Sequence, residues 1–271
     1  MICNNILEAI GHTPMIRLNR MHKPGSAEIL VKFEGLNVGG SVKTRVAYNM
    51  IRSAEKEGLI GPDTIIVEPT SGNQGIGLAL VGAVRGYKTV IIMPDSVSEE
   101  RRKLVNHYGA EVILIHDDGD IGKCIEKCVQ TAMDMKEADP NVFVPQQFEN
   151  RNNTFAHKYY TAPEILEQTA GRIDGFCSGI GTGGTITGIG DGIIPSILNR
   201  NIYDHIHIVT DEDAINTAKQ LASLEGIMCG ISSGTNVAAA IRLAEKLGEG
   251  RTVVTILPDT AERYFSTPLF E

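Results

Sequence analysis

The stretch Ile65-Ile66-Val67-Glu68-Pro69-Thr70-Ser71-Gly72-Asn73-Gln74-Gly75 decides the fold, because it joins a β-branched run to a helical pattern through a glycine-containing loop. Short runs that are nearly all apolar predict strands covered on both faces. Such runs recur at 89–93, 111–115, 206–209 and 252–257. Helical spacing occurs around and between them, at 46–58, 75–86, 99–108, 123–136, 211–225 and 237–247. This alternation predicts an α/β fold with parallel sheets.

Length and charge limit the possible classes of function. The 271 residues are enough for two domains, since single cores stop growing near about 250 residues. A formal net charge of −8 argues against nucleic acid as a partner, because that affinity depends on clustered Lys and Arg. No window approaches the roughly 20 apolar residues of a membrane span, and the first residues lack a signal-peptide pattern. We therefore expect a cytoplasmic protein that binds neither nucleic acid nor membrane.

The cysteines indicate neither a disulfide framework nor a metal site. Their number is odd and they are scattered: Cys3, Cys124, Cys128, Cys177 and Cys229. Cys124 and Cys128 are four residues apart in an expected helix, so they share a face, but no His or second Cys pair accompanies them. We expect reduced, buried thiols and no bound metal.

Two glycine clusters follow strand-like runs and precede helical patterns. They are the loop 70–75 and the segment 179–185, which comes after Phe176-Cys177. Helix N-termini carry unbonded N–H groups, and glycine lets an anion approach them closely. Two such sites suit a ligand with two anionic groups, or two ligands. The second cluster lacks the Gly-Lys-Ser/Thr of a phosphate-binding P-loop, so phosphoryl transfer from a nucleotide is not indicated; taken alone, it is also compatible with a plain glycine turn.

A single lysine, Lys43, follows the pair Gly39-Gly40 and stands just before a helical pattern. Partial burial near a helix N-terminus favours the neutral amine that Schiff-base chemistry needs. Taken alone, Lys43 is better interpreted as a surface residue in a turn. The motifs that surround it favour the chemical role.

Six motifs follow one another along the chain: 39–43 (Gly-Gly-Ser-Val-Lys), 68–73 (Glu-Pro-Thr-Ser-Gly-Asn), 146–150 (Gln-Gln-Phe-Glu-Asn), 181–185 (Gly-Thr-Gly-Gly-Thr), 230–234 (Gly-Ile-Ser-Ser-Gly) and 257–260 (Leu-Pro-Asp-Thr). In this order they resemble the motifs of the cysteine synthase family, which includes the cystathionine β-synthases. The opening 10–18 and the closing 262–267 are also similar, so the resemblance covers nearly the whole chain.

The resemblance implies a fold and a cofactor. The fold is two doubly wound open-sheet α/β domains of PLP fold type II, similar to the tryptophan synthase β-subunit, with pyridoxal 5′-phosphate (PLP) in the cleft between them. It assigns 45–150 to a small substrate-binding domain. Residues 1–44 and 151–271 would form a larger cofactor-binding domain. Family members usually form homodimers.

The resemblance also implies a role for each motif. Lys43 would form the internal aldimine and later remove the α-proton of the substrate. Thr260 would lie beside the pyridine nitrogen, where a neutral hydroxyl suits β-elimination. Asn73 would hydrogen-bond the ring oxygen, and the cofactor's phosphate would bind Gly181, Thr182, Gly183, Gly184 and Thr185. The substrate, through its α-carboxylate above all, would bind Thr70, Ser71, Gly72, Asn73, Gln74 and Gln147.

The reaction implied is β-replacement or β-elimination on L-cysteine or O-acetyl-L-serine through an aminoacrylate, so that cysteine and sulfide are made or consumed. The nucleophile is left open: sulfide, a thiol that gives cystathionine or lanthionine, or water. A binding protein without catalytic activity on the same fold is the alternative outside enzymology, and the intact Lys43 argues against it.

The chain departs from the family pattern at several positions. Val38, Thr44, Gln74 and Ala261 stand where proline, aspartate, threonine and glycine are frequent, and Gln74 borders the substrate loop. The segment Gly188-Ile189-Gly190-Asp191-Gly192 joins two parts that a strand, a helix and a loop normally separate. Such a unit is on the order of 30 residues. We therefore expect that residues near 188–189 are missing from the sequence.

Asp191 would face the β-carbon, where relatives more often carry an uncharged residue. A carboxylate there can activate water, so that L-cysteine would yield L-serine and hydrogen sulfide. This hypothesis stands beside a second interpretation, in which Asp191 only caps a helix, since aspartate is a preferred N-cap residue.

Overall fold

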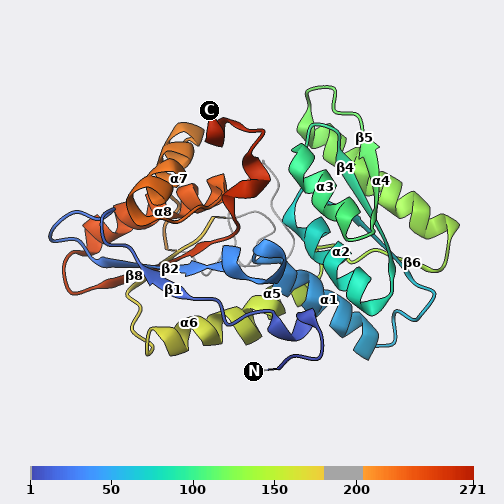
Figure 1. The fold of residues 1–271 in the computed structure, drawn as a ribbon, viewed down its shortest axis with the longest axis horizontal. Coiled ribbons are helices and arrows are strands. Elements are labelled where there is room, and N and C mark those ends of the chain that lie inside the picture. Colours follow the sequence, from blue (N-terminus) through green and yellow to red (C-terminus); the bar gives the residue numbers. More distant parts are fainter. Residues whose placement is uncertain (1, 180–203) are drawn as a thin grey trace. The chain divides into compact units, whose positions relative to one another are not determined.

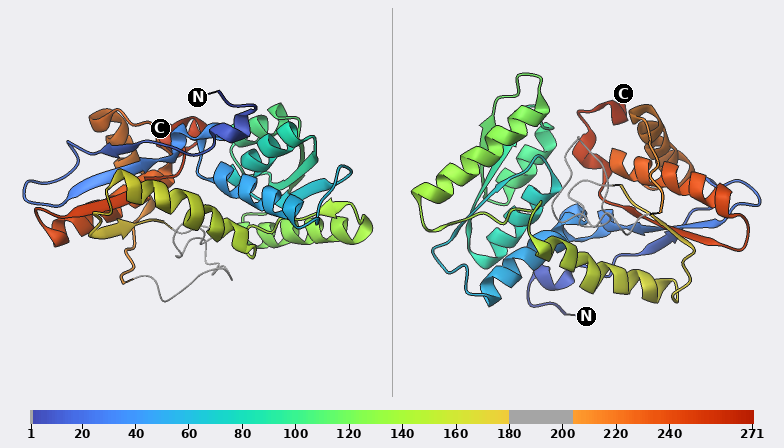
Figure 2. Two further views of the ribbon diagram at one scale, coloured as in Figure 1. Left: turned by 90° about the horizontal axis from the view of Figure 1, so that it is seen from below. Right: turned by 180° about the vertical axis from the view of Figure 1, so that it is seen from behind.

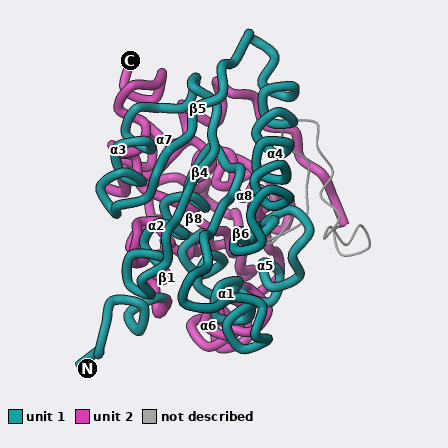
Figure 3. The backbone as a smooth tube through the Cα atoms, turned by 90° about the vertical axis from the view of Figure 1, so that its right-hand side faces the viewer, with its two compact units in different colours: residues 1–10, 43–156 teal, residues 11–42, 157–271 magenta. Residues whose placement is uncertain are grey.

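The structure is a computed structural model that describes residues 2–179 and 204–271 (Figure 1). The chain forms two compact units: unit 1 contains Met1–Ile10 and Lys43–Ala156, and unit 2 contains Gly11–Val42 and His157–Glu271 (Figure 3). These units differ from the domains expected from the sequence at 1–10, 43–44 and 151–156. The last difference has a clear cause, because Asn49 Nδ2 donates to Asn152 O at 2.7 Å and so ties 151–156 to the helix that begins at Lys43.

Unit 1 has a parallel sheet in the order β5-β4-β3-β6. The strands are β3 (Ile65–Pro69), β4 (Lys88–Pro94), β5 (Glu111–Ile115) and β6 (Val142–Phe143). The chain builds the sheet outward from β3 to β5 and then returns to the other side of β3 with β6. This reversal makes a topological switch point between β3 and β6, the place where open α/β sheets bind ligands.

Helices pack on both faces of this sheet: α2 (Asn73–Arg85) and α3 (Glu99–His107) on one face and α4 (Ile121–Ala138) on the other (Figures 1 and 2). α1 (Lys43–Lys56) packs on α2, α5 (Arg151–Ala156) packs on α1, and the short η1 (Ile6–Ala9) lies beside α2. Alternate strand residues face opposite ways. Val67 and Ile92 therefore pack on Cys128 of α4, whereas Ile91 faces the α2 side, where a Cβ on Gly75 would come within 2.9 Å of it.

Unit 2 has a mixed sheet in the order β1-β2-β8-β7, in which only β1 and β2 are antiparallel. Its strands are β1 (Met15–Arg17), β2 (Glu28–Phe33), β7 (Gly175–Cys177) and β8 (Thr252–Leu257). The helix α8 (Ile231–Leu247) packs on one face, with α7 (Asp211–Glu225) outside it, and α6 (Ala162–Gln168) packs on the other. Short helical turns complete the unit: η2 (Glu34–Leu36), η3 (Val38–Gly40), the π-turn η4 (His157–Thr161), η5 (Ala261–Tyr264) and η6 (Pro268–Phe270).

A buried lysine fixes the N-terminal loop of unit 2. Lys32 on β2 is fully buried, and its Nζ donates to Glu164 Oε2 at 2.7 Å, to Thr13 O at 2.6 Å and to Gln168 Oε1 at 3.0 Å. A buried charge is tolerated only when it is paired and hydrogen-bonded in this way. The network thus ties Gly11–Pro14 to both β2 and α6.

Most of the predicted strands and helices are confirmed, and one strand is wrong. The runs at 65–67, 89–93, 111–115 and 252–257 are strands, and all six helical patterns lie on helices. The run 206–209 is not a strand, and Ile208 is 85% exposed. Its carbonyl accepts from Arg242 Nη1 at 2.8 Å rather than from a neighbouring strand. A strand needs a ladder partner for its backbone groups, and none is present among the described residues.

All five thiols are free; Cys124, Cys128, Cys177 and Cys229 are buried, whereas Cys3 is partly exposed. Burial raises the pKa of Cys128 to about 12 and that of Cys177 to about 11. Thiols with such values are poor nucleophiles and poor metal ligands at neutral pH. Within the described ranges, no helix is long and apolar enough to cross a bilayer.

Gly234 tests the packing of α8 on α7. A Cβ at this position would overlap Ala214 O and lie 2.9 Å from Ala218 N, both of them backbone atoms of α7. Because α7 would have to shift, we expect Gly234→Ala to destabilise the protein by about 3 kcal/mol in denaturant unfolding. Gly61→Ala is the matched control, since a Cβ there meets nothing within 4 Å. Equal stability of the two variants would contradict this packing.

Candidate functional site

Lys43 is the first residue of α1, so the helix begins at the lysine itself and not after it. The backbone just before it is paired with the end of β8 in unit 2. Val42 N donates to Pro258 O at 2.8 Å, and Ser41 forms an antiparallel bridge with Asp259. Lys43 is half-buried. The two residues before Lys43 are thereby anchored by backbone pairing, and this anchors the backbone at the start of α1.

The glycine pair before Lys43 makes room for an arginine. Gly39 and Gly40 have φ angles of 74° and 69°, which favour glycine. A Cβ on Gly40 would come within 2.7 Å of both terminal nitrogens of Arg263. Arg263 is buried; it donates from Nη2 to Gly39 O and from Nη1 to Thr260 Oγ1, the latter at 2.7 Å. Arg263 thus holds the glycine loop and Thr260 together.

The hydroxyl oxygen of Thr260 acts as a hydrogen-bond acceptor for Arg263. A hydroxyl has only one proton to donate, and this bond does not use it. The O–H of Thr260 is therefore available as a donor to an acceptor placed beside it. Sequence reasoning identified Thr260 but not Arg263, whose only signal was its place three residues after Thr260.

In unit 1, the loop 70–72 forms an open N-terminus for α2. Thr70 N donates to Ile92 O at 2.9 Å, which anchors the loop to the sheet, and Gly72 N lies 3.4 Å from Thr70 Oγ1. Gly72 is the N-cap of α2 and provides no side-chain acceptor, and a Cβ there would meet nothing within 4 Å. An open helix N-terminus of this kind suits a carboxylate or phosphate.

Gln147 lies at the same edge of the sheet. It follows β6, as Thr70 follows β3, and these two strands flank the switch point. Gln147 is buried; its N donates to Glu68 Oε1 at 2.9 Å and its carbonyl accepts from Asn153 Nδ2 at 2.9 Å. The structure therefore places Gln147 and the loop 70–73 at the same edge of the unit 1 sheet. Sequence reasoning missed Glu68, although a carboxylate inside an otherwise apolar strand was a signal.

Gln74 points away from the loop. It is 1% exposed, and its Nε2 lies 3.6 Å from the Met50 sulfur on α1. Its Oε1 is buried without a hydrogen-bond partner among the described residues. The side chain therefore packs between α1 and α2, and the predicted contact of Gln74 with substrate stays a prediction.

Two parts of the predicted site lie outside the described residues. They are the candidate water-activating Asp191 and the predicted phosphate loop, Gly181, Thr182, Gly183, Gly184 and Thr185.

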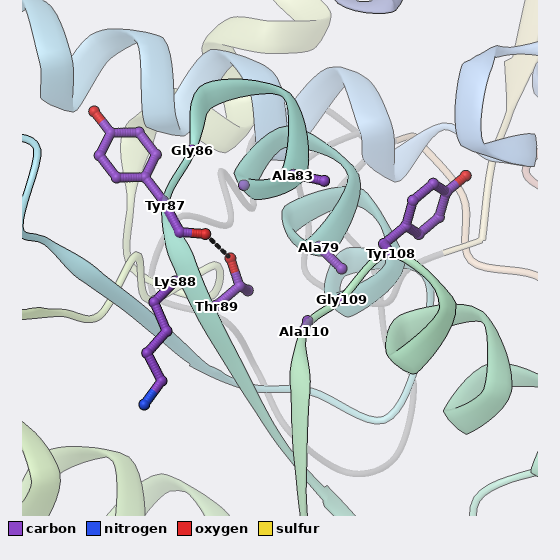
Figure 4. Close-up of a pocket in the computed structure, with 10 residues that line it drawn as sticks. Ala79, Ala83, Gly86, Tyr87, Lys88, Thr89, Tyr108, Gly109 and Ala110 are labelled. Carbon is purple, nitrogen blue, oxygen red and sulfur yellow. Dashed lines mark hydrogen bonds between the residues drawn. The ribbon is translucent and has the colours of Figure 1, made fainter.

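A cavity of about 260 Å³ lies at the other end of the unit 1 sheet (Figure 4). It is lined by the C-terminal part of α2, the start of β4 and residues 108–110 before β5. Thr89 lies in its wall, with Oγ1 3.5 Å from Tyr87 O (Figure 4). Ligands of open α/β sheets bind at the carboxyl ends of the strands. This cavity is at the amino ends, so it is not the candidate site.

Known proteins are similar to this chain in sequence. The profile of the family described as pyridoxal-phosphate dependent enzymes matches residues 6–203 and 191–259. Cysteine synthase from Staphylococcus aureus is 42% identical over 305 residues, which covers 98% of this chain and 97% of that protein. The chain is a pyridoxal-phosphate-dependent enzyme of the cysteine synthase family. The resemblance seen in its motifs is confirmed.

Solved structures of the cysteine synthase family confirm the fold. O-ureido-L-serine synthase superposes with a TM-score of 0.93 and 37% identity, covering 100% of this chain and 96% of that one. A hydrogen sulfide-producing enzyme from Fusobacterium nucleatum gives a TM-score of 0.90 and 37% identity, covering 97% and 100%. The two α/β units thus have the fold type II architecture that was predicted.

The alignment with the Staphylococcus aureus cysteine synthase is longer than this chain. It spans 305 residues, whereas the chain has 271, so at least 34 of its positions have no counterpart in this sequence. The family profile also matches in two parts that overlap at 191–203. That residues near 188–189 are missing from the sequence stays a prediction.

The described residues fit the cofactor of the cysteine synthase family. PLP carries a phosphate, a carbonyl carbon that takes an amine, and a pyridine nitrogen that accepts a hydrogen bond. Lys43, at the start of α1, would provide the amine, and Thr260, whose oxygen accepts from Arg263, would donate its O–H to the nitrogen. Ser41 Oγ and Thr44 Oγ1, on either side of Lys43, are buried polar atoms without a hydrogen-bond partner in the described part of the chain.

Arg263 provides a test of this fit. Arg263→Met removes two buried hydrogen bonds from a charged donor, each worth about 1.5–3 kcal/mol, and releases both Thr260 and Gly39. We expect PLP to bind the apoenzyme at least tenfold more weakly, as measured by fluorescence titration. Arg251→Met is the control in the same unit, because Arg251 is exposed and pairs with Asp174. Equal affinities in the two variants would show that Arg263 does not support the cofactor.

Proposed function

We propose that Lys43 holds PLP and that the enzyme exchanges or eliminates the β-substituent of L-cysteine or O-acetyl-L-serine. The observation that carries this proposal is the anchored position of Lys43, at the start of α1 and next to backbone paired with 258–259. The 42% identity with a cysteine synthase supports the substrate class.

The substrate is held by its α-carboxylate. The N-terminus of α2, the Thr70 and Ser71 side chains, and Gln147 are the groups that bind this anion. They lie at one edge of the unit 1 sheet. N–H groups at a helix N-terminus and an amide side chain suit a carboxylate without a metal or an arginine.

We assign both proton transfers to Lys43. Bound PLP withdraws electrons from the α-carbon of the substrate and so makes its proton acidic. With PLP bound, Lys43 Nζ would be the base that removes the α-proton of the substrate. The same amine returns a proton when the product forms.

The remaining site residues orient and tune the site. Asn73, at the start of α2, would hydrogen-bond the ring oxygen of the cofactor. Thr260 would donate its O–H to the pyridine nitrogen, and a neutral hydroxyl at this place suits loss of the β-substituent. The segment 181–185 is assigned to the phosphate by the family motif.

In the main reaction, acetate leaves from O-acetyl-L-serine and sulfide adds to the β-carbon, so the products are L-cysteine and acetate. The similarity to O-ureido-L-serine synthase favours a serine-type carbon skeleton. A thiol as nucleophile would give cystathionine or lanthionine instead.

A second reaction is favoured by the similarity to the hydrogen sulfide-producing enzyme. L-Cysteine would lose sulfide, water would add to the β-carbon, and L-serine and hydrogen sulfide would leave. Asp191 is the candidate group that takes the proton from this water.

We also propose a homodimer in the cytoplasm, as the family resemblance implies. Exposed apolar side chains on neighbouring turns of unit 2, such as Leu166 at 53% exposure, support an interface between copies.

Titration of the holoenzyme with O-acetyl-L-serine and then L-cysteine tests the donor. We expect a change in the visible spectrum with the true donor, and release of acetate or sulfide in equal amounts with the product. Lys43→Ala should reduce turnover at least a thousandfold, since it removes both the attachment and the base. A protein without a spectral response to either amino acid would be the catalytically silent alternative.

Product analysis with L-cysteine alone tests the second reaction. We expect L-serine and hydrogen sulfide in equal amounts from the wild type, and at least tenfold less L-serine from Asp191→Asn, which keeps the shape but not the base. Unchanged serine output in this variant would leave Asp191 without a role in activating water.

A further inference from the structure

Glu68 is a carboxylate inside the unit 1 sheet. It is fully buried near the carboxyl end of β3, where it pairs in register with Ile91 of β4. Ile91 faces the side of the sheet covered by α2, so Glu68 faces the same side. A buried carboxylate is costly unless its oxygens accept hydrogen bonds.

Each oxygen of Glu68 accepts one backbone N–H from the turn after β6. Gln147 N donates to Oε1 at 2.9 Å, and Gln146 N donates to Oε2 at 2.9 Å. Two neighbouring amides thus converge on one side chain. Bonds of this kind to an ionised group are roughly twice as strong as neutral ones.

The turn that Glu68 holds has a strained backbone. Gln146 has a φ of 59°, which residues other than glycine rarely adopt. Such a conformation persists only where the surroundings impose it. The carboxylate of Glu68 imposes it from the sheet side, while Asn153 Nδ2 holds the Gln147 carbonyl at 2.9 Å from the side of α5.

Glu68 also lies two residues before Thr70 in the same strand. Its backbone is fixed by the ladder with β4, and Thr70 N continues this ladder by donating to Ile92 O. One residue therefore connects both parts of the carboxylate site, the loop 70–73 through its backbone and Gln147 through its side chain.

From this geometry we propose that Glu68 is a positioning residue, which sets the distance between Gln147 and the loop 70–73 and so determines how tightly the enzyme binds the α-carboxylate of its substrate. The inference rests on the proposed function. Glu68 acts without touching the substrate, because its side chain is fully buried.

The ionised form of Glu68 is the one that accepts both amides. Burial raises its pKa to about 7, and the two backbone N–H groups oppose this rise. The ionisable residues on the elements around Glu68 lie at the ends of those elements. Lys88 and Asp95 flank the buried part of β4, and Arg85 lies at the far end of α2. Glu149 and Arg151, which follow the turn, are exposed. β6 contributes none. Burial is therefore the main cause of the raised pKa of Glu68.

This pKa gives a direction for the pH dependence. Below about pH 7 Glu68 gains a proton, one oxygen becomes a weak acceptor, and Gln147 is held less firmly. Affinity for the carboxylate should then fall as the pH falls. Stability changes in the opposite sense: because the folded pKa is raised from 4.5, the folded state loses stability as the pH rises from 4.5 to about 7.

The test compares two unreactive probes, L-alanine and ethylamine, which differ only by the carboxyl group. Their dissociation constants from the holoenzyme are read from the visible spectrum of the cofactor at pH 6 to 8.5. The ratio of the two constants isolates the carboxylate contact. In the wild type we expect L-alanine to lose affinity relative to ethylamine by about tenfold between pH 8 and pH 6.

Glu68→Gln removes the titration and turns one acceptor into a donor that faces an N–H. At pH 8 we expect L-alanine to bind about tenfold more weakly, with ethylamine unchanged and with no dependence of the ratio on pH. For the substrate, KM should rise about tenfold while kcat changes less than twofold, as expected for binding that is equal in the ground state and the transition state. Amide hydrogen exchange at Gln146 and Gln147 should accelerate.

Glu111→Gln is the matched control, since Glu111 is an exposed carboxylate on β5 of the same sheet. If the ratio of the L-alanine and ethylamine dissociation constants is the same in Glu68→Gln as in the wild type, the proposal is overturned. A fall in kcat at constant KM overturns it as well. If this variant does not fold, a ratio independent of pH in the wild type also overturns it. If the wild type gives no spectral response to either probe, the proposed function has failed rather than this inference.

Discussion

The position of Lys43 depends on a short stretch of backbone pairing in unit 2. Ser41 bridges Asp259, and Val42 N donates to Pro258 O, so the chain arrives at Lys43 along the end of β8. The next residues of that strand end lead to Thr260, whose oxygen is held by Arg263. Ser41, Val42 and Thr260 thus all lie at the end of β8 within unit 2. A site placed by strands and helix starts is more exact than one carried by a long loop.

The substrate side of the site follows a second constraint, the switch point between β3 and β6. Adjacent parallel strands end at the same edge, so the loop 70–73 and Gln147 converge although 74 residues separate Gln147 from Asn73 in the chain. Glu68 connects the two across that edge with paired hydrogen bonds. Burial raises the pKa of this carboxyl to about 7, so its ionised form costs stability at neutral pH.

Sequence reasoning found the features that repeat along the chain. Buried parallel strands are continuously apolar, so 65–67 and 252–257 were predictable, and ordered motifs identified Lys43 and Gln147. Features that depend on distant partners were missed: β2 contains the charged Lys32, whose partner Glu164 lies 132 residues away, and Arg263 meets Gly39 across 224 residues. The prediction of a strand at 206–209 was wrong for the same reason, because an apolar pattern does not reveal whether a partner strand exists.

The most direct measurement is reductive trapping with borohydride followed by mass spectrometry of peptides from the holoenzyme. The account predicts one pyridoxyl group, attached to Lys43 in the peptide that contains Gly39 and Gly40. A pyridoxyl group on another lysine, or none on the reduced protein, would contradict the assignment of the site.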